Sequence, residues 1–182
     1  MRLFVAIEIP EEIREKLWKA ARDFGMKGVI LSNKDQYHIT LQFLGEMEES
    51  RLPVIKEALS TINCKAFKIK ISGISSFDPT LRVLFADIKE GSEELKSIYA
   101  GIDSEFTKRG ISYEKENSFK PHLTLARVKF LKDKTLLLPI MSKYSSYEFG
   151  KFHARSMILK VSKPSTSGYA YEDLYEVKLQ TS

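Results

Sequence analysis

The spacing of hydrophobic residues divides the first quarter of the chain into strands and a helix. Hydrophobic side chains recur at every second position in residues 2–9, which is the period of a β-strand. Residues 11–24 carry them at helical spacing instead, and Gly25 is placed to end that helix. A short strand around residues 28–32 is predicted next, and a longer one over residues 36–45 follows it.

The rest of the chain is predicted to hold three more helices and several strands. One helix runs from Ser50, as its N-terminal cap, to about Ile62. The clearest helical pattern begins at Ser92 and is closed by Gly110, with acidic residues in its first turn. A weaker helix around residues 132–144 contains a proline. Strands are predicted at residues 67–74, 81–88, 119–129, 147–154, 155–162 and 171–179, with residues 163–168 as a loop before the last one.

Two of the predicted strands carry a histidine followed two residues later by a threonine. The stretch QYHITLQFLG contains His38 and Thr40, and KPHLTLARVK contains His122 and Thr124. Side chains two apart in a strand point to the same side, so each strand presents an imidazole and a hydroxyl while aliphatic neighbours anchor the other face. The chain has three histidines, and threonine occupies eight of its 182 positions. Two such pairs would rarely arise by chance, and together they indicate a site.

The residue types of the two motifs suit acid–base chemistry on a phosphate. One imidazole accepts a proton from a nucleophile while the other donates a proton to a leaving group, and both act near neutral pH. The two hydroxyls can donate hydrogen bonds to the oxygens of an anion held between them. This symmetry matches an in-line displacement at phosphorus, as in ribonucleases and cyclic phosphodiesterases, and it requires no metal ion.

The order of the predicted elements favours an α+β fold with mainly antiparallel sheets. Strands and helices are mixed without the strict alternation of a doubly wound parallel sheet. The two motif histidines lie 84 residues apart (122 minus 38), close to half the chain, which indicates a weak internal duplication. We therefore expect one domain over residues 1–182, in which two halves related by a pseudo-two-fold axis bring the motifs together.

Composition says more about the partners and the cellular location of the protein than about the reaction that it catalyses. The net charge of +5 suits a phosphate-bearing partner, although an ordinary basic surface explains it as well. No hydrophobic run is long enough to span a membrane, and the N-terminus turns acidic too soon for a secretory signal. The one cysteine, Cys64, fits a reducing cytoplasm, so we expect a cytoplasmic protein. Amides are scarce beside abundant lysine and glutamate, a pattern of proteins from hot environments.

The stretches HITLQFLG and HLTLARV, with the opening RLFVAIEIPEEI, resemble the two-histidine phosphoesterase superfamily. They are most similar to its RNA 2′,3′-cyclic phosphodiesterases, which are also called 2′-5′ RNA ligases, and the resemblance covers essentially the whole chain. It implies a bilobal α+β fold with flanking helices and a central cleft that carries both HxTx motifs. It also implies hydrolysis of a terminal 2′,3′-cyclic phosphate on RNA to a 2′-phosphate, without a metal or another cofactor.

The motif residues alone leave the roles of the two histidines open, but the resemblance assigns them. It implies that His122 is the proton acceptor that activates water and that His38 is the proton donor to the departing 3′-oxygen. Thr40 and Thr124 would bind the phosphate. Because the two motifs are so alike, the sequence by itself does not tell the acid from the base.

The resemblance also implies that Phe43 and Arg127, each five residues after its histidine, flank the nucleotide. Phe43 would stack on a base or line the pocket, and Arg127 would add positive charge. Strict alternation places both on the opposite face from the histidines, so a bulge or a strong twist would have to redirect them. The alternatives are core packing for Phe43 and a surface ion pair for Arg127.

Three other functions use the same features. A basic α+β protein could hold RNA without cutting it, although binding alone does not need the paired motifs. A ligase would run the displacement in reverse with the same residues, but water at its bulk concentration favours hydrolysis. A third enzyme would act on another substrate, such as ADP-ribose 1″,2″-cyclic phosphate or a 2′-5′ oligoadenylate. We expect no obligate protein partner, no membrane partner and a monomer.

Other candidate residues carry weaker signals. His153 lacks the threonine two residues later, and no pair of histidines has the close spacing typical of a zinc enzyme. Cys64 follows a predicted helix without an acid–base partner nearby in the sequence, which favours a structural role. Residues 163–168 lack the phosphate-cradle pattern and are interpreted as a loop, which could close over a substrate. Tyrosines 169, 171 and 175 are more often packing residues than stacking platforms.

Overall fold

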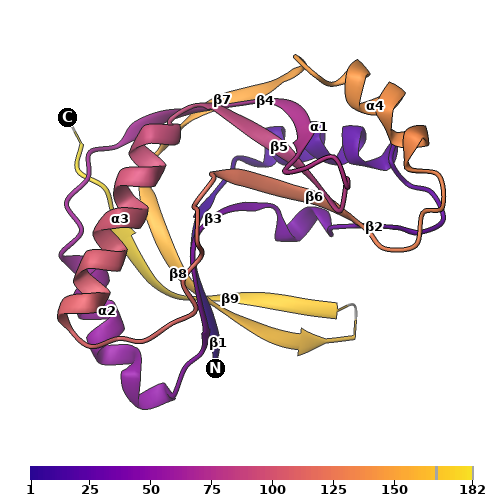
Figure 1. The fold of residues 1–182 in the computed structure, drawn as a ribbon. Helices are drawn as coiled ribbons and strands as arrows, with labels where there is room; N and C mark the ends of the chain where they lie inside the picture. Colours follow the sequence, from indigo (N-terminus) through magenta and orange to yellow (C-terminus); the bar gives the residue numbers. More distant parts are fainter. Residues whose placement is uncertain (167, 182) are drawn as a thin grey trace.

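Two antiparallel sheets form the two lobes of the molecule (Figure 1). The computed structural model describes residues 1–166 and 168–181. The first sheet has the order β3-β1-β8-β9, with β1 Arg2–Glu8, β3 His38–Glu46, β8 Ser156–Ser165 and β9 Gly168–Lys178. The second has the order β2-β6-β5-β4-β7, with β2 Val29–Leu31, β4 Phe67–Ser76, β5 Val83–Glu90, β6 His122–Val128 and β7 Glu148–Ala154. The predicted α+β class with mainly antiparallel sheets is confirmed.

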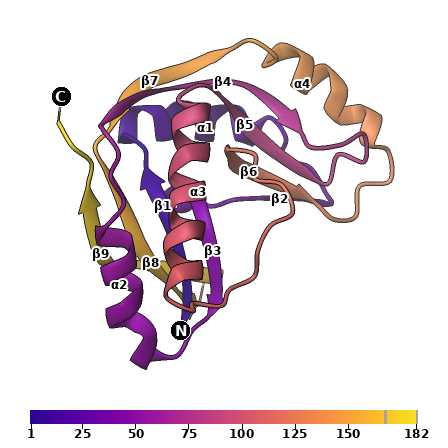
Figure 2. The same ribbon diagram turned by 60° about the vertical axis from the view of Figure 1, so that its left-hand side comes forward.

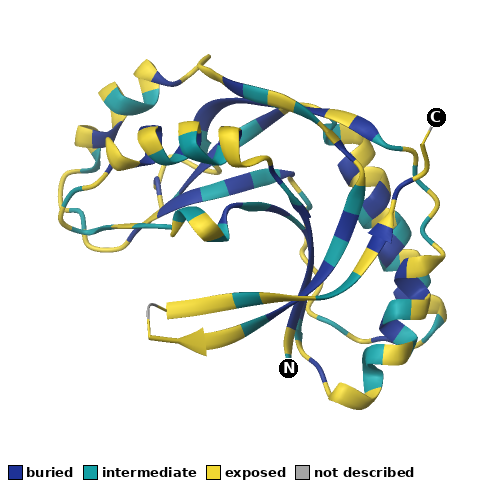
Figure 3. Cartoon of the chain, turned by 180° about the vertical axis from the view of Figure 1, so that it is seen from behind, coloured by how far each residue is buried: buried dark blue, intermediate teal, exposed yellow. Residues whose placement is uncertain are grey.

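The helices tie the two lobes together, because α1 and α3 each pack against the sheet of the other half. The helices are α1 Glu11–Arg22, α2 Leu52–Ser60, α3 Ser92–Lys108 and the short α4 Leu138–Lys143. Helix α1 follows β1 of the first sheet but packs against β6 and β7 of the second. Helix α3 follows β5 of the second sheet and packs against β3 of the first (Figure 2). Buried residues follow the central strands and the inner faces of these helices (Figure 3).

The strand orders confirm the predicted duplication. The order β3-β1-β8-β9 in one sheet corresponds to β6-β5-β4-β7 in the other, with a motif strand first in each series. In each half the strand paired with the motif strand leads directly into a long helix, since α1 follows β1 and α3 follows β5. Strand β2 is an addition that pairs with the outer edge of β6. The halves are therefore related by a pseudo-two-fold arrangement that places the motif strands at equivalent positions.

The start of α2 differs from the prediction. Ser50 does not cap the helix, because Glu49–Arg51 form a 3₁₀ turn and α2 begins at Leu52. The Ser50 hydroxyl donates instead to a carboxylate oxygen of Glu48. A proline in the first turn of α2 explains the later start, since proline is tolerated where no intrahelical N–H bond is made.

The prediction of a loop at residues 163–168 is also wrong. Strand β8 continues to Ser165, and β9 begins at Gly168 with Pro164 paired to Tyr169. Ser167 lies outside the described residues. The polar composition of this segment, with one proline, suggested a loop. In Figure 1 the β8–β9 hairpin projects from the first lobe below β2 and β6, and its described end residues are exposed. The weaker helix at 132–144 is a 3₁₀ turn, Lys134–Leu137, followed by α4. None of the helices in the described ranges is long and apolar enough to cross a membrane.

Gly28 and Gly45 both have a positive φ, but only Gly28 lacks space for a side chain. Gly45 has φ +72°, and a Cβ there would meet nothing within 4 Å among the described atoms. Gly28 has φ +95°, and a Cβ there would lie 2.6 Å from the backbone nitrogen of Leu131. The Gly28 carbonyl also accepts hydrogen bonds from Lys129 and Phe130 in that turn.

We expect Gly45→Ala to lower the free energy of unfolding by about 1 kcal/mol, the usual cost of a left-handed residue with a Cβ. Gly28→Ala carries the same strain and a backbone clash as well, so it should cost clearly more. Urea titration of both variants beside the wild type measures the difference. Equal losses for the two variants would show that the turn at 129–131 yields to the added methyl group.

Candidate active site

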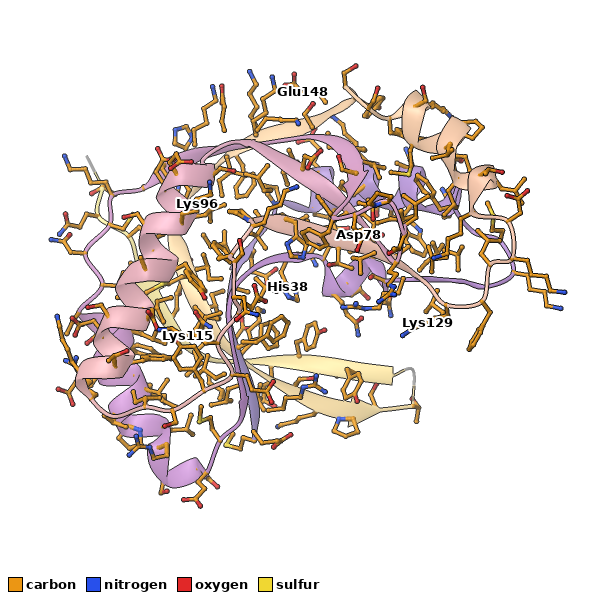
Figure 4. All side chains as sticks on the ribbon, viewed as in Figure 1. His38, Asp78, Lys96, Lys115, Lys129 and Glu148 are labelled. Atoms are coloured by element: carbon orange, nitrogen blue, oxygen red, sulfur yellow. The ribbon has the colours of Figure 1, made fainter. Side chains whose placement is uncertain are left out.

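The two motif strands bring all four predicted motif side chains to one cavity. Strands β3 and β6 lie in contact although they belong to different sheets. A cavity of about 860 Å³ lies between the lobes. Its lining includes His38, Thr40, His122 and Thr124. In Figure 4, His38 is seen on β3 where this strand approaches β6.

Burial of the intervening aliphatic residues explains why these side chains face the cavity. Ile39 and Leu41 are buried on one face of β3, and Leu123 and Leu125 are buried in the same way on β6. Because side chains alternate along a strand, burying these residues turns the histidines and threonines to the other face. The four motif side chains are half-buried, as expected for groups at the wall of a cavity.

A matching bulge in each motif strand redirects Phe43 and Arg127 into the same cavity. In β3, Val5 pairs with Gln42 while Ala6 pairs with Thr40, so one extra residue of β3 is inserted at Leu41. In β6, the pairing of Leu84 and Phe85 skips Leu125 in the same way.

Each bulge shifts the alternation by one residue, and two consecutive buried residues precede Phe43 and Arg127. Phe43 is 44% exposed and lines the cavity. Arg127 also lines the cavity, and it makes no ion pair with any described carboxylate.

A backbone carbonyl two residues earlier holds one ring nitrogen of His122. The Nδ1 atom of His122 lies 2.7 Å from the Lys120 carbonyl oxygen. Because that oxygen can only accept, Nδ1 carries the proton, and Nε2 keeps a lone pair for accepting one. The backbone of Gln36, two residues before His38, acts to raise the pKa of that imidazole.

Burial makes both imidazoles harder to protonate. It lowers the pKa of His38 from its ordinary 6.5 to about 4, and it also lowers the pKa of His122. The Glu8 carboxylate acts in the opposite direction on His38, whereas the Lys160 ammonium adds to the lowering. Both rings are therefore neutral in the free protein at pH 7.

Aromatic rings enclose each histidine, a feature that the sequence analysis missed. His38 lies 5.0 Å from the ring centroid of Phe4 and 5.3 Å from that of Tyr171. His122 lies 4.7 Å from Phe77 and 5.3 Å from Phe85 in the same measure. Phe4 and Phe85 come from the strands paired with the two motifs, so the pattern of a phenylalanine beside each motif strand was a usable signal. Tyr171 was interpreted as a packing residue, but it lines the cavity.

A buried lysine holds two carboxylates beside His38. Lys160 is 6% exposed, and its ammonium lies 2.5 Å from Glu8 and 2.6 Å from Asp173. Glu8 is the residue opposite His38 in the pairing of β1 with β3, and Arg14 also binds it at 2.8 Å. A lysine inside the hydrophobic stretch RSMILKVS was the sequence signal for this network. Its pairing offsets the cost of burying the charge.

The remaining candidates lie away from the cavity. His153 is on β7, at the edge of the second sheet and separated from β6 by two strands. Cys64 lies near the end of α2, in a hollow with residues of α3. In the parts of the chain that the structure describes, no three histidine, cysteine or carboxylate side chains are placed to hold a metal ion.

Comparison with known proteins points to one family. Residues 8–179 match the family model of the AKAP7 2′5′ RNA ligase-like domain. A protein of Methanocaldococcus jannaschii named RNA 2′,3′-cyclic phosphodiesterase is 37% identical over 97% of this chain and 99% of its own length. One of the same name from Archaeoglobus fulgidus is 36% identical over 96% and 98%.

Solved structures share the fold over nearly the whole chain. The structure of TT0787 of Thermus thermophilus has a TM-score of 0.80 at 27% identity and covers 98% of both chains. Escherichia coli LigT in complex with 3′-AMP has a TM-score of 0.82 at 21% identity, covering 98% of this chain and 97% of its own.

The lowered pKa of His38 predicts a dependence of stability on pH. Between about pH 4 and the ordinary value of 6.5, the unfolded chain binds a proton at His38 that the folded protein does not. The free energy of unfolding should therefore rise with pH in this window, by up to about 1.4 kcal/mol per pH unit for one proton.

In His38→Gln this contribution is absent, so urea titrations from pH 4 to 7 should give a flatter dependence than the wild type. Parallel curves for the two proteins would contradict the burial of a neutral His38.

Proposed function

This chain belongs to the family of the RNA 2′,3′-cyclic phosphodiesterases, and we propose that it hydrolyses the terminal 2′,3′-cyclic phosphate of RNA to a 2′-phosphate. The observation that carries the proposal is the meeting of both His–Thr pairs at a single cavity. Two imidazoles and two hydroxyls on facing strands supply the groups that displacement at a phosphate requires.

His122 is the proton acceptor in this reaction. Its Nδ1–H is engaged by the Lys120 carbonyl, which leaves the Nε2 lone pair for a water molecule. As water attacks phosphorus, a P–O bond forms and the water proton passes to His122. The lowered pKa of His122 keeps the ring neutral, as a base must be before the reaction.

His38 is the proton donor to the 3′-oxygen as the P–O3′ bond breaks. It must be protonated before this step, although its pKa in the free protein lies near 4. A bound cyclic phosphate brings a negative charge next to the ring, and this favours the protonated form. The Glu8 carboxylate acts in the same direction. The proton thus enters His38 together with the substrate, and the products are a 2′-phosphate and a 3′-hydroxyl.

The other lining residues hold the substrate. The hydroxyls of Thr40 and Thr124 donate to the non-bridging phosphate oxygens, where negative charge increases in the transition state. Arg127 adds positive charge at the same wall, and the exposed ring of Phe43 offers a surface on which a base stacks. The side chains supply every proton transfer, so the reaction needs no metal ion.

The chain works as one bilobal domain over residues 1–182, as a monomer in the cytoplasm. The exchange of α1 and α3 between the lobes supports a single folding unit. One half-buried cysteine is in keeping with a reducing compartment.

We expect His38→Ala and His122→Ala each to lower turnover by about two to four orders of magnitude, the usual contribution of a positioned acid or base. The substrate is a short RNA with a 2′,3′-cyclic phosphate end, assayed in EDTA. His153→Ala is the matched control, since His153 lies two strands away from β6, and it should keep wild-type activity.

A loss below tenfold for both motif variants would remove the histidines from the mechanism. Activity that EDTA abolishes and Zn²⁺ or Mn²⁺ restores would favour a metal enzyme. Binding of the RNA without conversion would favour a binding protein or a different cyclic phosphate. Joining of the cyclic end to a 5′-hydroxyl would favour the ligase.

A further inference from the structure

Beyond His38, the cleft-facing surface of the first sheet carries an aromatic side chain next to a basic one, Tyr169 and Arg2. Arg2 of β1 and Tyr171 of β9 both pair with Ser162 of β8, so they lie in one row across the sheet. Tyr169 lies two residues before Tyr171 in β9, on the same face and nearer the turn of the hairpin. The Arg2 guanidinium carbon lies 5.7 Å from the centroid of the Tyr169 ring, which is 47% exposed.

This pair borders the active-site cavity. Tyr171 lines the cavity with its ring 5.3 Å from that of His38. Gln36 lines it as well, and its side-chain amide donates to the carbonyl of Tyr169. Two residues of a strand span about 7 Å, a length that one nucleotide of an extended strand covers. A chain bound with its end at His38 therefore reaches Tyr169 with the nucleotide before the last.

Basic side chains without carboxylate partners surround this path. Neither Arg2 nor Arg127 nor Lys129 makes an ion pair with a carboxylate in residues 1–166 and 168–181. Lys129 follows Arg127 by two residues at the end of β6, and Figure 4 shows it at the edge of the second lobe, on the side of the β8–β9 hairpin. Burial raises the pKa of the Tyr171 hydroxyl, and the charges of Arg2 on β1 and Arg127 on β6 both act to lower it. Unpaired cations on both sides of an aromatic surface suit a polyanion.

We propose that Tyr169 and Arg2 form a second nucleotide subsite, which binds the nucleotide on the 5′ side of the cyclic phosphate. The base stacks on the Tyr169 ring, and the Arg2 guanidinium binds the phosphate that links the two nucleotides. An aromatic ring with an adjacent cation is the combination by which proteins hold single-stranded nucleic acid without reading its sequence. This inference rests on the proposed function and extends it, because it makes the end of a polynucleotide the preferred substrate over a cyclic mononucleotide.

The test compares two substrates with the same cyclic end, adenosine 2′,3′-cyclic phosphate and a short oligoadenylate, which differ in the nucleotides on the 5′ side of that end. The wild type should have the higher kcat/KM for the oligonucleotide. Tyr169→Ala and Arg2→Gln should each lower that value by about 5- to 50-fold while leaving the cyclic mononucleotide within about twofold. Tyr169→Phe keeps the ring and should behave as the wild type. Tyr147→Ala is the matched control, because Tyr147 is similarly exposed (48%) but does not line the cavity.

A binding experiment decides the inference even if no turnover is found. The probes are 2′-AMP and a fluorescent oligoadenylate ending in a 2′-phosphate, which are the products of the two substrates. Tyr169→Ala should weaken binding of the oligonucleotide alone. Arg2→Gln should also flatten the plot of log affinity against log salt by about 0.7, the value for one phosphate contact on a single strand. Equal losses on both probes, or no loss on either, would overturn the subsite. Failure of the wild type to convert either substrate would instead count against the proposed function.

Discussion

The active site depends on one structural constraint, which is the β-bulge at the same position of each motif strand, β3 and β6. A regular strand would bury Phe43 and Arg127 on the face opposite the histidines. Inserting one buried leucine after each threonine shifts the alternation, so the histidine, the threonine and the fifth residue all face the cavity. The strands paired with β3 and β6, which are β1 and β5, place one residue opposite two at each bulge.

This arrangement creates a conflict between burial and proton transfer. The aliphatic residues that fix the motif strands, with the aromatic rings around each histidine, also remove water from the imidazoles. Burial keeps both rings neutral in the free protein, which suits a base and opposes an acid. The network of Lys160, Glu8 and Asp173 places opposing charges beside His38, where the proposed acid lies. In this account an anionic substrate supplies the remaining charge, so that protonation of His38 is coupled to binding.

Local patterns explain which parts could be predicted from the sequence. The strands, the long helices and the two His–Thr motifs follow from spacing along the chain, because each depends on neighbours within a few residues. From the sequence, a bulge could be named only as a requirement for Phe43 and Arg127 to face the cavity. Its position could not be predicted, because the register of a strand is fixed by its partner strands. The aromatic rings around the histidines were missed because Phe4, Phe77 and Phe85 reach them across strands. Only residues 163–168, at the end of the β8–β9 hairpin, were predicted as a loop, because their composition is polar and their strand structure comes from pairing.

The proposed mechanism requires that the paired motifs direct water to phosphorus and expel the 3′-oxygen. The most direct measurement is hydrolysis of an RNA 2′,3′-cyclic phosphate in ¹⁸O-labelled water with EDTA present, followed by ³¹P NMR of the product end. The mechanism predicts a 2′-phosphate that carries one ¹⁸O atom. A 3′-phosphate, or a 2′-phosphate without the label, would contradict it.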